Sequence, residues 1–212
     1  MKLFLPDNYE VRAVPSYYDD SENTDNWQNE VYFLAKQLAV ESNIKEVFDY
    51  GCGSGFKLRK YFLKSNLCSC GIDLPPTVEF LRKKYPTSAW LTVDEFDFES
   101  LSKESMLICS DVIEHMEDPI LFMQRLAGSN VGVVVLSTPA RELLVETGQT
   151  KTLGPPTNTS HVCEWTCREF NQLVSQFFVI SEHFVSHVLQ ATQVVIAYRK
   201  DIQQDDIIKV LS

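Results

Sequence analysis

The stretch VFDYGCGSGF, residues 47–56, decides how we interpret the whole chain. Its apolar start is typical of a buried strand over residues 46–50, and the chain then has three glycines at alternate positions. A segment with apolar residues at helical spacing follows, with Phe56, Leu58, Tyr61, Phe62 and Leu63. The stretch therefore predicts a strand, a tight turn and a helix. Glycines permit positive φ and let a ligand lie against the backbone beside the unpaired N–H groups of the new helix, so the turn has the form of a cofactor cradle.

Two acids accompany the glycines. Asp49 lies two residues before Gly51, and Asp73 follows the short apolar run 70–72. A separation of about twenty residues places a carboxylate at the end of the next strand, where it faces ribose hydroxyls in nucleotide-binding folds. The glycine spacing is G-x-G-x-G, whereas the dinucleotide fingerprint is G-x-G-x-x-G, and this difference argues against a nicotinamide cofactor and a dehydrogenase.

This arrangement resembles motif I of the class I S-adenosylmethionine-dependent methyltransferases, in which the acid and the glycine backbone face the methionine end of the cofactor. The resemblance implies that the cofactor is S-adenosyl-L-methionine and the product S-adenosyl-L-homocysteine. It also implies cofactor contacts by the following residues of the two stretches: Asp49, Tyr50, Gly51, Cys52, Gly53, Gly55, Asp73 and Leu74.

Acids also follow the third expected strand, residues 89–93. Relatives use an acid at this place to hold the adenine amino group of the cofactor. The resemblance makes Asp94 the first choice for that contact, with Glu95 beside it, and Asp97 the second choice. The alternative is that these side chains are solvated acids of a turn.

The sequence SDVIEHMEDP, residues 110–119, follows the fourth expected strand and closely resembles the DVLEHxxDP signature of one large methyltransferase subgroup. The resemblance places Ser110 and Asp111 beside the cofactor at the carboxyl edge of a central strand. Asp118 and Pro119 are a good N-cap and first-turn pair for the next helix. His115 either faces the substrate or ties down the loop by a hydrogen bond.

Residues 158–170 resemble the NxxHVxEWTxxEF stretch of the same subgroup, with Cys163 where relatives often carry Arg. Thr166 and Glu169 form a capping box, and Trp165 with Phe170 forms a hydrophobic staple, so a helix is expected to begin here.

His161 enters this segment from a long loop and either reaches the active site or fixes the loop. A hydroxyl acceptor needs a base, and a histidine with a pKa near neutrality suits that task, so His115 and His161 are the candidate catalytic residues.

Alternation of strands and helices predicts right-handed βαβ units and a parallel sheet. The expected fold is α/β: a single-domain, Rossmann-like methyltransferase fold with a seven-stranded, mostly parallel sheet, one antiparallel strand and helices on both faces. The expected strands are 46–50, 67–72, 89–93, 106–109, 131–136, 178–184 and 192–198, the last two as an antiparallel edge. A helix over 77–84 follows Pro75 and Pro76. Residues 139–163 are expected to be a long loop or lid.

We expect three parts along the chain. Residues 1–40 form an N-terminal arm and a cap helix, the helix running over 27–39 with Trp27 on its inner face. Residues 41–200 form the S-adenosylmethionine-binding methyltransferase domain, and 201–212 form a tail. Tyr17, Tyr18 and residues 27–32 resemble the N-terminal cap that many methyltransferases of this class place over the cofactor, and the alternative is a helix that only packs on the core.

Composition limits the partners. The chain has 212 residues and a net charge of −10 with no cluster of Lys or Arg, so a nucleic acid is not an expected partner. The longest apolar run, 131–136, is too short to span a membrane, and we expect no membrane association and a cytoplasmic location. We expect a monomer or a homodimer.

The six cysteines fit reduced thiols better than a disulfide scaffold, and the spacing of His161, Cys163 and Cys167 lacks a fourth ligand, so no metal site is expected.

These observations predict an S-adenosylmethionine-dependent methyltransferase that acts on a small-molecule methyl acceptor. The subgroup resembled favours O-methylation of a sugar or metabolite hydroxyl. Two alternatives remain: an N-methyltransferase, and a non-catalytic cofactor-binding or partner module.

Overall fold

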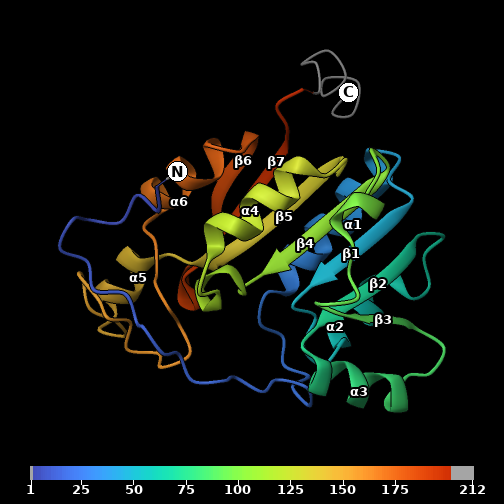
Figure 1. Ribbon diagram of the computed structural model, residues 1–212, viewed down its shortest axis with the longest axis horizontal. Helices are drawn as coiled ribbons and strands as arrows, with labels where there is room; N and C mark the ends of the chain where they lie inside the picture. The colour runs from blue at the N-terminus through green and yellow to red at the C-terminus, as the bar shows by residue number, and fades with distance from the viewer. Residues whose placement is uncertain (1, 202–212) are drawn as a thin grey trace.

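Seven strands form one sheet in the computed structural model, which describes residues 2–201 (Figure 1). The strands are β1 (Glu46–Tyr50), β2 (Cys68–Asp73), β3 (Ala89–Thr92), β4 (Ser105–Ser110), β5 (Val133–Pro139), β6 (Phe178–His187) and β7 (Thr192–Arg199). Their order across the sheet is β3-β2-β1-β4-β5-β7-β6, and only β7 runs antiparallel to its neighbours. The predicted fold class is confirmed.

Helices cover both faces of the sheet. They are α1 (Asn29–Glu41), α2 (Phe56–Phe62), α3 (Pro75–Lys84), α4 (Pro119–Gly128), α5 (Arg141–Glu146) and α6 (Cys167–Ser175), with short 3-10 turns η1 (Phe98–Ser100), η2 (Ile113–His115) and η3 (Val188–Gln190). The buried faces of α1, α2 and α3 share one hydrophobic core, and those of α4 and α6 share a second core on the opposite face.

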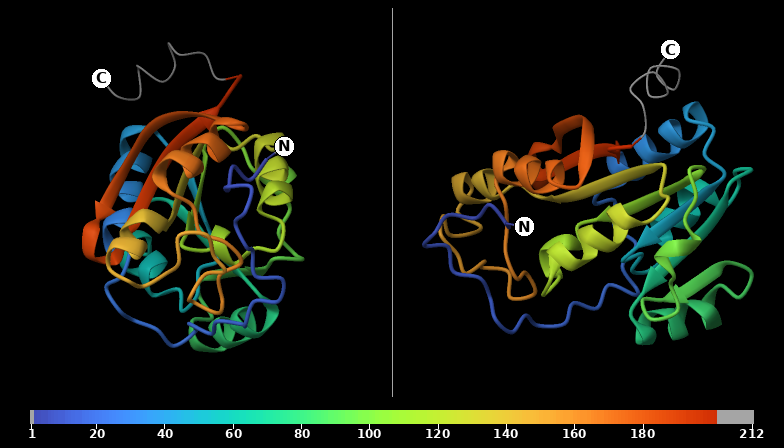
Figure 2. Two further views of the ribbon diagram at one scale, coloured as in Figure 1. Left: turned by 90° about the vertical axis from the view of Figure 1, so that its left-hand side faces the viewer. Right: turned by 45° about the horizontal axis from the view of Figure 1, so that its top comes forward.

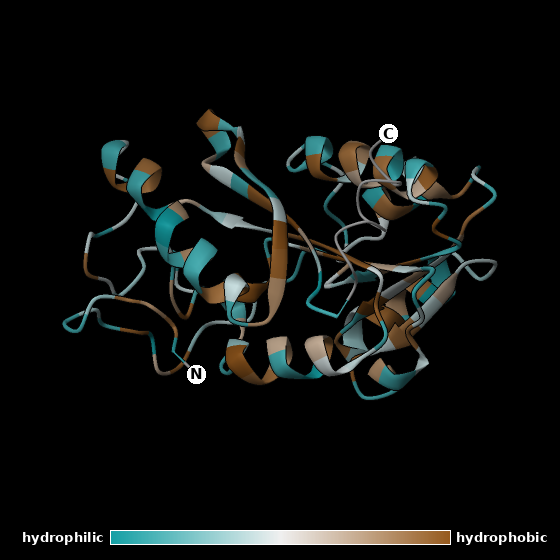
Figure 3. Ribbon diagram, turned by 90° about the horizontal axis from the view of Figure 1, so that it is seen from above, coloured by the Kyte–Doolittle hydropathy of each residue, from teal (hydrophilic) through white to brown (hydrophobic). Residues whose placement is uncertain are grey.

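The central strands are buried on both faces. In β4, Met106 and Ile108 point into the core under α1, while Leu107 and Cys109 point into the core under α4. The central strands in Figure 3 are brown over most of their length for this reason. A strand between two helical layers needs apolar side chains on both sides, which explains the continuous apolar runs in the sequence.

The order of the strands reverses at β1, which pairs with β2 on one side and β4 on the other. Loops that follow neighbouring strands therefore leave toward opposite faces of the sheet, and a crevice opens at the carboxyl ends between them. The glycine turn after β1, Asp73 at the end of β2 and the 110–112 loop after β4 all lie at this edge.

Most strand boundaries differ from the prediction by one to three residues. Two differences, in β5 and α3, have a clear physical reason. Strand β5 runs over Val133–Pro139 and not 131–136, because Ser137 and Thr138 continue the ladder with β7. Their hydroxyl groups find partners in the loop after β4, which makes polar residues tolerable there. Helix α3 begins at Pro75 and not at Thr77, since proline is accepted in the first turn of a helix, where the missing N–H has no partner.

The expectation of a long loop over 139–163 is wrong at its start, where α5 occupies Arg141–Glu146. This short segment carries two leucines, good helix formers, and Leu144 is buried. The prediction for the first helix is also wrong in one respect: α1 begins at Asn29, so Trp27 lies before it and is 51% exposed.

The N-terminal arm, residues 2–28, contains no helix or strand and runs alongside the segment before α6 (Figure 2). Backbone N–H groups of Glu10, Arg12 and Ser16 donate to the carbonyl groups of Leu153, Val162 and Thr159. These hydrogen bonds join the arm to a segment about 145 residues away in the chain. The arm is therefore fixed across the carboxyl edge of the sheet.

Residues 202–212, and with them nearly all of the predicted tail, lie outside the described residues. Within residues 2–201, no helix has the length and apolar character needed to cross a membrane.

Helix α6 begins as predicted. The Thr166 hydroxyl accepts from the N–H of Glu169, the Glu169 carboxylate accepts from the N–H of Thr166, and the Trp165 and Phe170 rings lie 5.9 Å apart. This start positions the preceding residues 158–165 against the rest of the molecule.

Replacing the Thr166 cap should destabilise the protein. We expect Thr166→Ala to lower the free energy of unfolding by about 1 kcal/mol, because an N–H at the helix start loses its acceptor. Urea denaturation of the variant measures this loss, with Thr152→Ala, at an exposed threonine, as the matched control. Equal stability of the two variants would contradict the role of the cap.

Candidate active site

A cavity of about 1100 Å³ opens at the carboxyl edge of the sheet. Its walls come from the N-terminal arm, the glycine turn, the ends of β2 and β4, η2 and residues 158–164. Nine of the predicted site residues line it: Tyr50, Gly51, Cys52, Asp73, Leu74, Ser110, Asp111, His115 and His161. Five others are outside the lining: Asp49, Gly53, Gly55, Asp94 and Glu95.

The glycine turn is held tightly by its surroundings. Gly51 and Gly53 have φ of +80° and +50°, and a Cβ on either would overlap the side chain of Val112 or of Asp20. The N–H groups of Gly51 and Cys52 both donate to the carbonyl of Ile72 in β2, at 2.8 and 3.1 Å. Only glycine fits these two positions without moving the neighbouring segments.

Asp49 lies beneath this turn and is fully buried. The Tyr32 hydroxyl of α1 lies 3.0 and 3.1 Å from its two carboxylate oxygens and donates to the carboxylate. Burial raises the pKa of Asp49 to about 7, against the opposing effects of the Tyr32 hydrogen bond and of Lys57. The acid is thus a buried support for the turn and does not line the cavity.

Asp73 ties the turn to the end of β2. Its Oδ2 accepts from the N–H of Gly53 at 2.8 Å, and its Oδ1 accepts from the N–H of Leu74 at 2.7 Å. Burial raises the pKa of Asp73, and these backbone hydrogen bonds oppose the shift. A carboxylate has about four lone-pair positions, so oxygen lone pairs of Asp73 remain for a ligand in the cavity.

The arm supplies side chains that the sequence prediction missed. Asp20 lies against Gly53, and burial together with repulsion from Asp73 raises its pKa to about 6, against the opposing effect of Lys57. Gln28 donates from Nε2 to Oδ2 of Asp111 at 2.6 Å, and the Tyr18 ring stacks on His115 at 6.2 Å. Tyr18 and Gln28 belong to the segments that the sequence indicated as a cap, whereas nothing in the sequence pattern pointed to Asp20.

The acids after β3 have local partners. Glu95 forms an ion pair with Arg82 at 2.7 Å and accepts from the N–H of Thr92, while Asp97 caps η1 by accepting from the N–H of Glu99. Asp94 is exposed. The cavity wall near this loop is formed instead by Val93 and Phe98.

His115 both faces the cavity and ties down a loop by a hydrogen bond, the two roles that the sequence left as alternatives. It lines the cavity, and its Nδ1–H donates to the carbonyl of Ser160 at 2.9 Å, which leaves the lone pair on Nε2. Burial, with a smaller effect of His161, lowers the pKa of His115 to about 4. The imidazole is therefore neutral at neutral pH, and the pKa near neutrality assumed for a base does not hold for it.

His161 also lines the cavity and fixes its own loop. Its Nδ1–H donates to Oε1 of Glu164 at 2.8 Å, and its Nε2 accepts from the Asn158 amide at 2.9 Å. The two histidine rings meet edge to face with centroids 4.7 Å apart.

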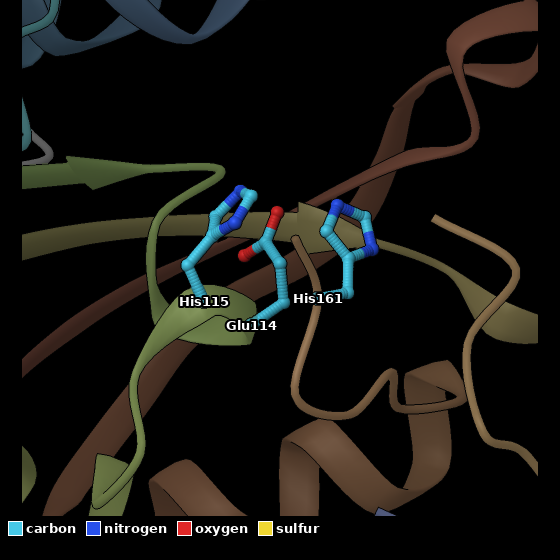
Figure 4. Close-up of side chains that lie close together, drawn as sticks. All are labelled: Glu114, His115 and His161. Atoms are coloured by element: carbon cyan, nitrogen blue, oxygen red, sulfur yellow. The ribbon is translucent and has the colours of Figure 1, made fainter. Parts of the chain in front are cut away.

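Glu114 lies between the two imidazole rings (Figure 4). It is fully buried, and its Oε2 accepts from the Thr138 hydroxyl at 3.0 Å. One ligand-type atom each of Glu114, His115 and His161 lies within 4.8 Å of the others. The expectation of no metal site did not consider this group, because His161 lies far along the chain from the adjacent Glu114 and His115.

The cavity is strongly acidic. Its lining has eight carboxylates and two basic side chains: Asp20, Asp25, Asp73, Asp111, Glu114, Glu117, Asp118 and Glu164, against Lys57 and Arg125. A concentration of one sign of charge in a concave site attracts ligands of the opposite charge. The cavity therefore favours a cationic ligand.

The profile of a protein family described as a methyltransferase domain matches residues 23–190. The chain belongs to this methyltransferase family. The match includes the glycine turn, Asp73, both histidines and α6, and thus the whole carboxyl edge of the sheet.

Solved structures share the fold of this methyltransferase at low sequence identity. A chain from the complex between the Haloferax volcanii Trm112 methyltransferase activator and a methyltransferase is 14% identical, with a TM-score of 0.61 over 86% of this chain and 99% of that one. Magnesium protoporphyrin IX methyltransferase from Synechocystis PCC 6803, with bound S-adenosylhomocysteine, is 20% identical, with a TM-score of 0.59 over 82% and 83%. An O-methyltransferase family protein from Burkholderia thailandensis is 14% identical, with a TM-score of 0.60 over 83% and 57%. No curated protein sequence matches this chain.

The protein is thus a methyltransferase, and the solved structures that share its fold include one with bound S-adenosylhomocysteine. The similar structures differ in their named substrates, so they do not determine the methyl acceptor of this methyltransferase.

The buried Asp49 predicts a distinctive dependence of stability on pH. Its pKa is about 7 in the folded protein and near 4 in the unfolded chain, so between these values the folded state binds more protons. Its contribution therefore declines as pH rises from 4 to 7 and is constant above 7. We expect the free energy of unfolding of Asp49→Asn to rise relative to that of the wild type by about 4 kcal/mol over that range, since each pKa unit corresponds to about 1.4 kcal/mol.

Urea denaturation of both proteins from pH 4.5 to 8 measures this difference. Asp7→Asn, which changes an exposed aspartate of the arm, is the control and should follow the wild type at every pH. Parallel curves for Asp49→Asn and the wild type would show that Asp49 is ionised in the folded protein throughout.

Proposed function

We propose that this methyltransferase binds S-adenosyl-L-methionine at the glycine-turn end of its cavity and methylates a hydroxyl group of a small molecule at the His115 end. The observation that carries the proposal is that Gly51, Asp73, His115 and His161 all line one cavity. One volume of about 1100 Å³ has room for a cofactor and a small acceptor side by side.

Three features of the glycine-turn end support cofactor binding there. Gly51 and Cys52 of the turn line the cavity, so a ligand there can lie against their backbone. Asp73 and Asp20 present carboxylates beside it. S-adenosylmethionine supplies an electrophilic methyl group on a positively charged sulfonium, which suits the excess of acids in the lining.

The arm supports the reaction by covering the cavity. From this segment Asp20 lies against Gly53, Gln28 donates to Asp111, and Tyr18 stacks on His115. We therefore include the arm in the catalytic unit. Methyl transfer requires two aligned ligands and the exclusion of water, and a cover that is hydrogen-bonded to the 150–165 segment provides both.

At the acceptor end, we assign the role of base to the lone pair on Nε2 of His115. The acceptor oxygen loses its proton as its new bond to the methyl carbon forms and the carbon–sulfur bond breaks. Ser160 fixes the tautomer of His115 by accepting from Nδ1, so Nε2 is free to interact with that proton. A sugar or metabolite hydroxyl is the substrate class that the two signature segments favour.

N-methylation is the second candidate, and the acidic lining favours it. An amine acceptor is cationic at neutral pH and would be drawn to Asp111, Glu114 and Glu164. It would then have to lose its proton before transfer.

Calorimetric titration tests the cofactor site. We expect the wild type to bind S-adenosylmethionine and S-adenosylhomocysteine but not NAD. We expect Gly53→Arg to bind neither, because its side chain would displace Asp20 and distort the turn. A folded wild type that binds neither ligand would contradict the proposal.

Two aspartate variants refine this titration. We expect Asp73→Asn to weaken S-adenosylhomocysteine binding about tenfold, because the carboxylate lines the cavity. Asp94→Asn should change the affinity less than twofold, because Asp94 lies outside the lining. The reverse order would show that the acid after β3 holds the adenine.

Transfer of a labelled methyl group to a panel of small alcohols, phenols and amines tests the acceptor end. For a hydroxyl acceptor we expect His115→Gln to lower kcat at least a hundredfold with unchanged S-adenosylmethionine affinity. The control is His183→Gln, since His183 contacts Asn171 and Gln193 outside the cavity lining. Equal turnover of the two variants would exclude a role for His115.

A further inference from the structure

Two buried carboxylate oxygens at the acceptor end lack a hydrogen-bond partner. Within residues 2–201, six buried side-chain atoms are unpartnered, and the two carboxylate oxygens among them are Oε1 of Glu114 and Oε2 of Glu164. Both residues line the cavity, and their side chains are at most 1% exposed. Leaving a buried carboxylate oxygen without a donor is costly, so a group that satisfies these oxygens is expected.

The two histidines beside Glu114 are oriented as metal-binding histidines are. Each donates its Nδ1–H to an oxygen behind it, His115 to the Ser160 carbonyl and His161 to the Glu164 carboxylate. An outer oxygen of this kind fixes the tautomer of an imidazole ligand and leaves the Nε2 lone pair for an ion. Nε2 of His115 has no hydrogen-bond partner among the described residues, and Nε2 of His161 has only the Asn158 amide.

The three side chains are close enough to share one ion. Their ligand atoms lie within 4.8 Å of one another, and the carboxylate of Glu114 stands between the rings (Figure 4). Bonds of about 2.0–2.2 Å from an ion place its ligand atoms roughly 3–4 Å apart, so small side-chain rotations would close the group.

We propose that Glu114, His115 and His161 form a binding site for a divalent transition-metal cation in the wall of the cavity. That this wall is the acceptor end rests on the proposed function, whereas the ion site itself does not. In this site the ion takes the place of the Asn158 amide at Nε2 of His161.

The ligand set selects the kind of ion. Two imidazole nitrogens and one carboxylate suit Mn²⁺, Fe²⁺, Co²⁺ or Zn²⁺ better than Ca²⁺ or Mg²⁺, which prefer oxygen ligands. Three protein ligands leave open positions, and the cavity gives an entry path to them. Burial, together with repulsion from Asp111 and Glu164, raises the pKa of Glu114, and the ion's charge also compensates for that repulsion.

The ion defines a substrate class. With the ion bound, the Nε2 lone pair of His115 is a metal ligand and no longer the base of the proposed function, and the ion takes over that role. A hydroxyl bound at an open position loses its proton to solvent more readily, because the cation stabilises the resulting oxyanion. The oxygen lone pair then forms the bond to the methyl carbon, and the electrons of the broken carbon–sulfur bond pass to sulfur. Acceptors with two adjacent oxygens, such as vicinal hydroxyls, fill two open positions and are the substrates this site favours.

Electron paramagnetic resonance titration with Mn²⁺ tests the site. The full chain is treated with a chelator, dialysed and titrated, and loss of the free Mn²⁺ signal gives stoichiometry and affinity. We expect one tight site per chain in the wild type and at least tenfold weaker binding by Glu114→Gln and by His115→Gln. The control is Glu146→Gln, which alters an exposed acid outside the cavity lining and should change the affinity less than twofold.

S-adenosylhomocysteine binding, measured on the same samples, separates this inference from the proposed function. A wild type that binds S-adenosylhomocysteine but not Mn²⁺ overturns the ion site alone, and the opposite result overturns the cofactor proposal alone. Equal Mn²⁺ affinity of the wild type and Glu114→Gln also overturns the ion site. If Glu114→Gln fails to fold, His115→Gln decides in the same way.

Discussion

The turn from β1 into α2 is the constraint on which the rest of the site depends. Its three glycines have no room for a Cβ because side chains of three other segments fill the space: Val112 after β4, Asp20 of the arm and Trp90 of β3. The turn is therefore the point at which four parts of the chain meet. Its backbone also donates hydrogen bonds to Ile72 and Asp73 of β2. A side chain at any of the three glycines would break these contacts, and with them the shape of the cavity.

The parts of the fold that the sequence predicted are those with local causes. The glycine spacing after β1, the Asp118 cap of α4 and the capping box at Thr166 are each complete within a few residues, and each has its predicted structure. The misplaced boundaries have causes outside their own segments. Strand β5 continues through Ser137 and Thr138 because β7 and the loop after β4 supply partners for them.

The site was harder to predict than the fold, because each polar side chain has several possible hydrogen-bond or ion-pair partners and only the folded structure decides between them. Asp94 and Glu95 stand in the right place in the sequence for an adenine contact, yet Glu95 pairs with Arg82 on α3 and closes its own turn. Asp20 carries no pattern that separates it from the other acids of the arm, and only burial beside Gly53 and Asp73 distinguishes it. These interactions depend on distances in the folded protein, which the spacing of residues along the sequence does not give.

The two signature segments form one physical unit, although His115 and Ser160 are 45 residues apart in the chain. The N–H of Val162 donates to the Glu114 carbonyl at 2.7 Å, while His115 donates back to the Ser160 carbonyl at 2.9 Å. Because these hydrogen bonds run in both directions, η2 and the 158–165 segment cannot shift independently. The arm is joined to the same unit, since the N–H of Arg12 donates to the Val162 carbonyl. Glu114 and the two histidines are thus held at fixed positions by backbone contacts, which is what a site that must orient a small acceptor against a bound cofactor requires.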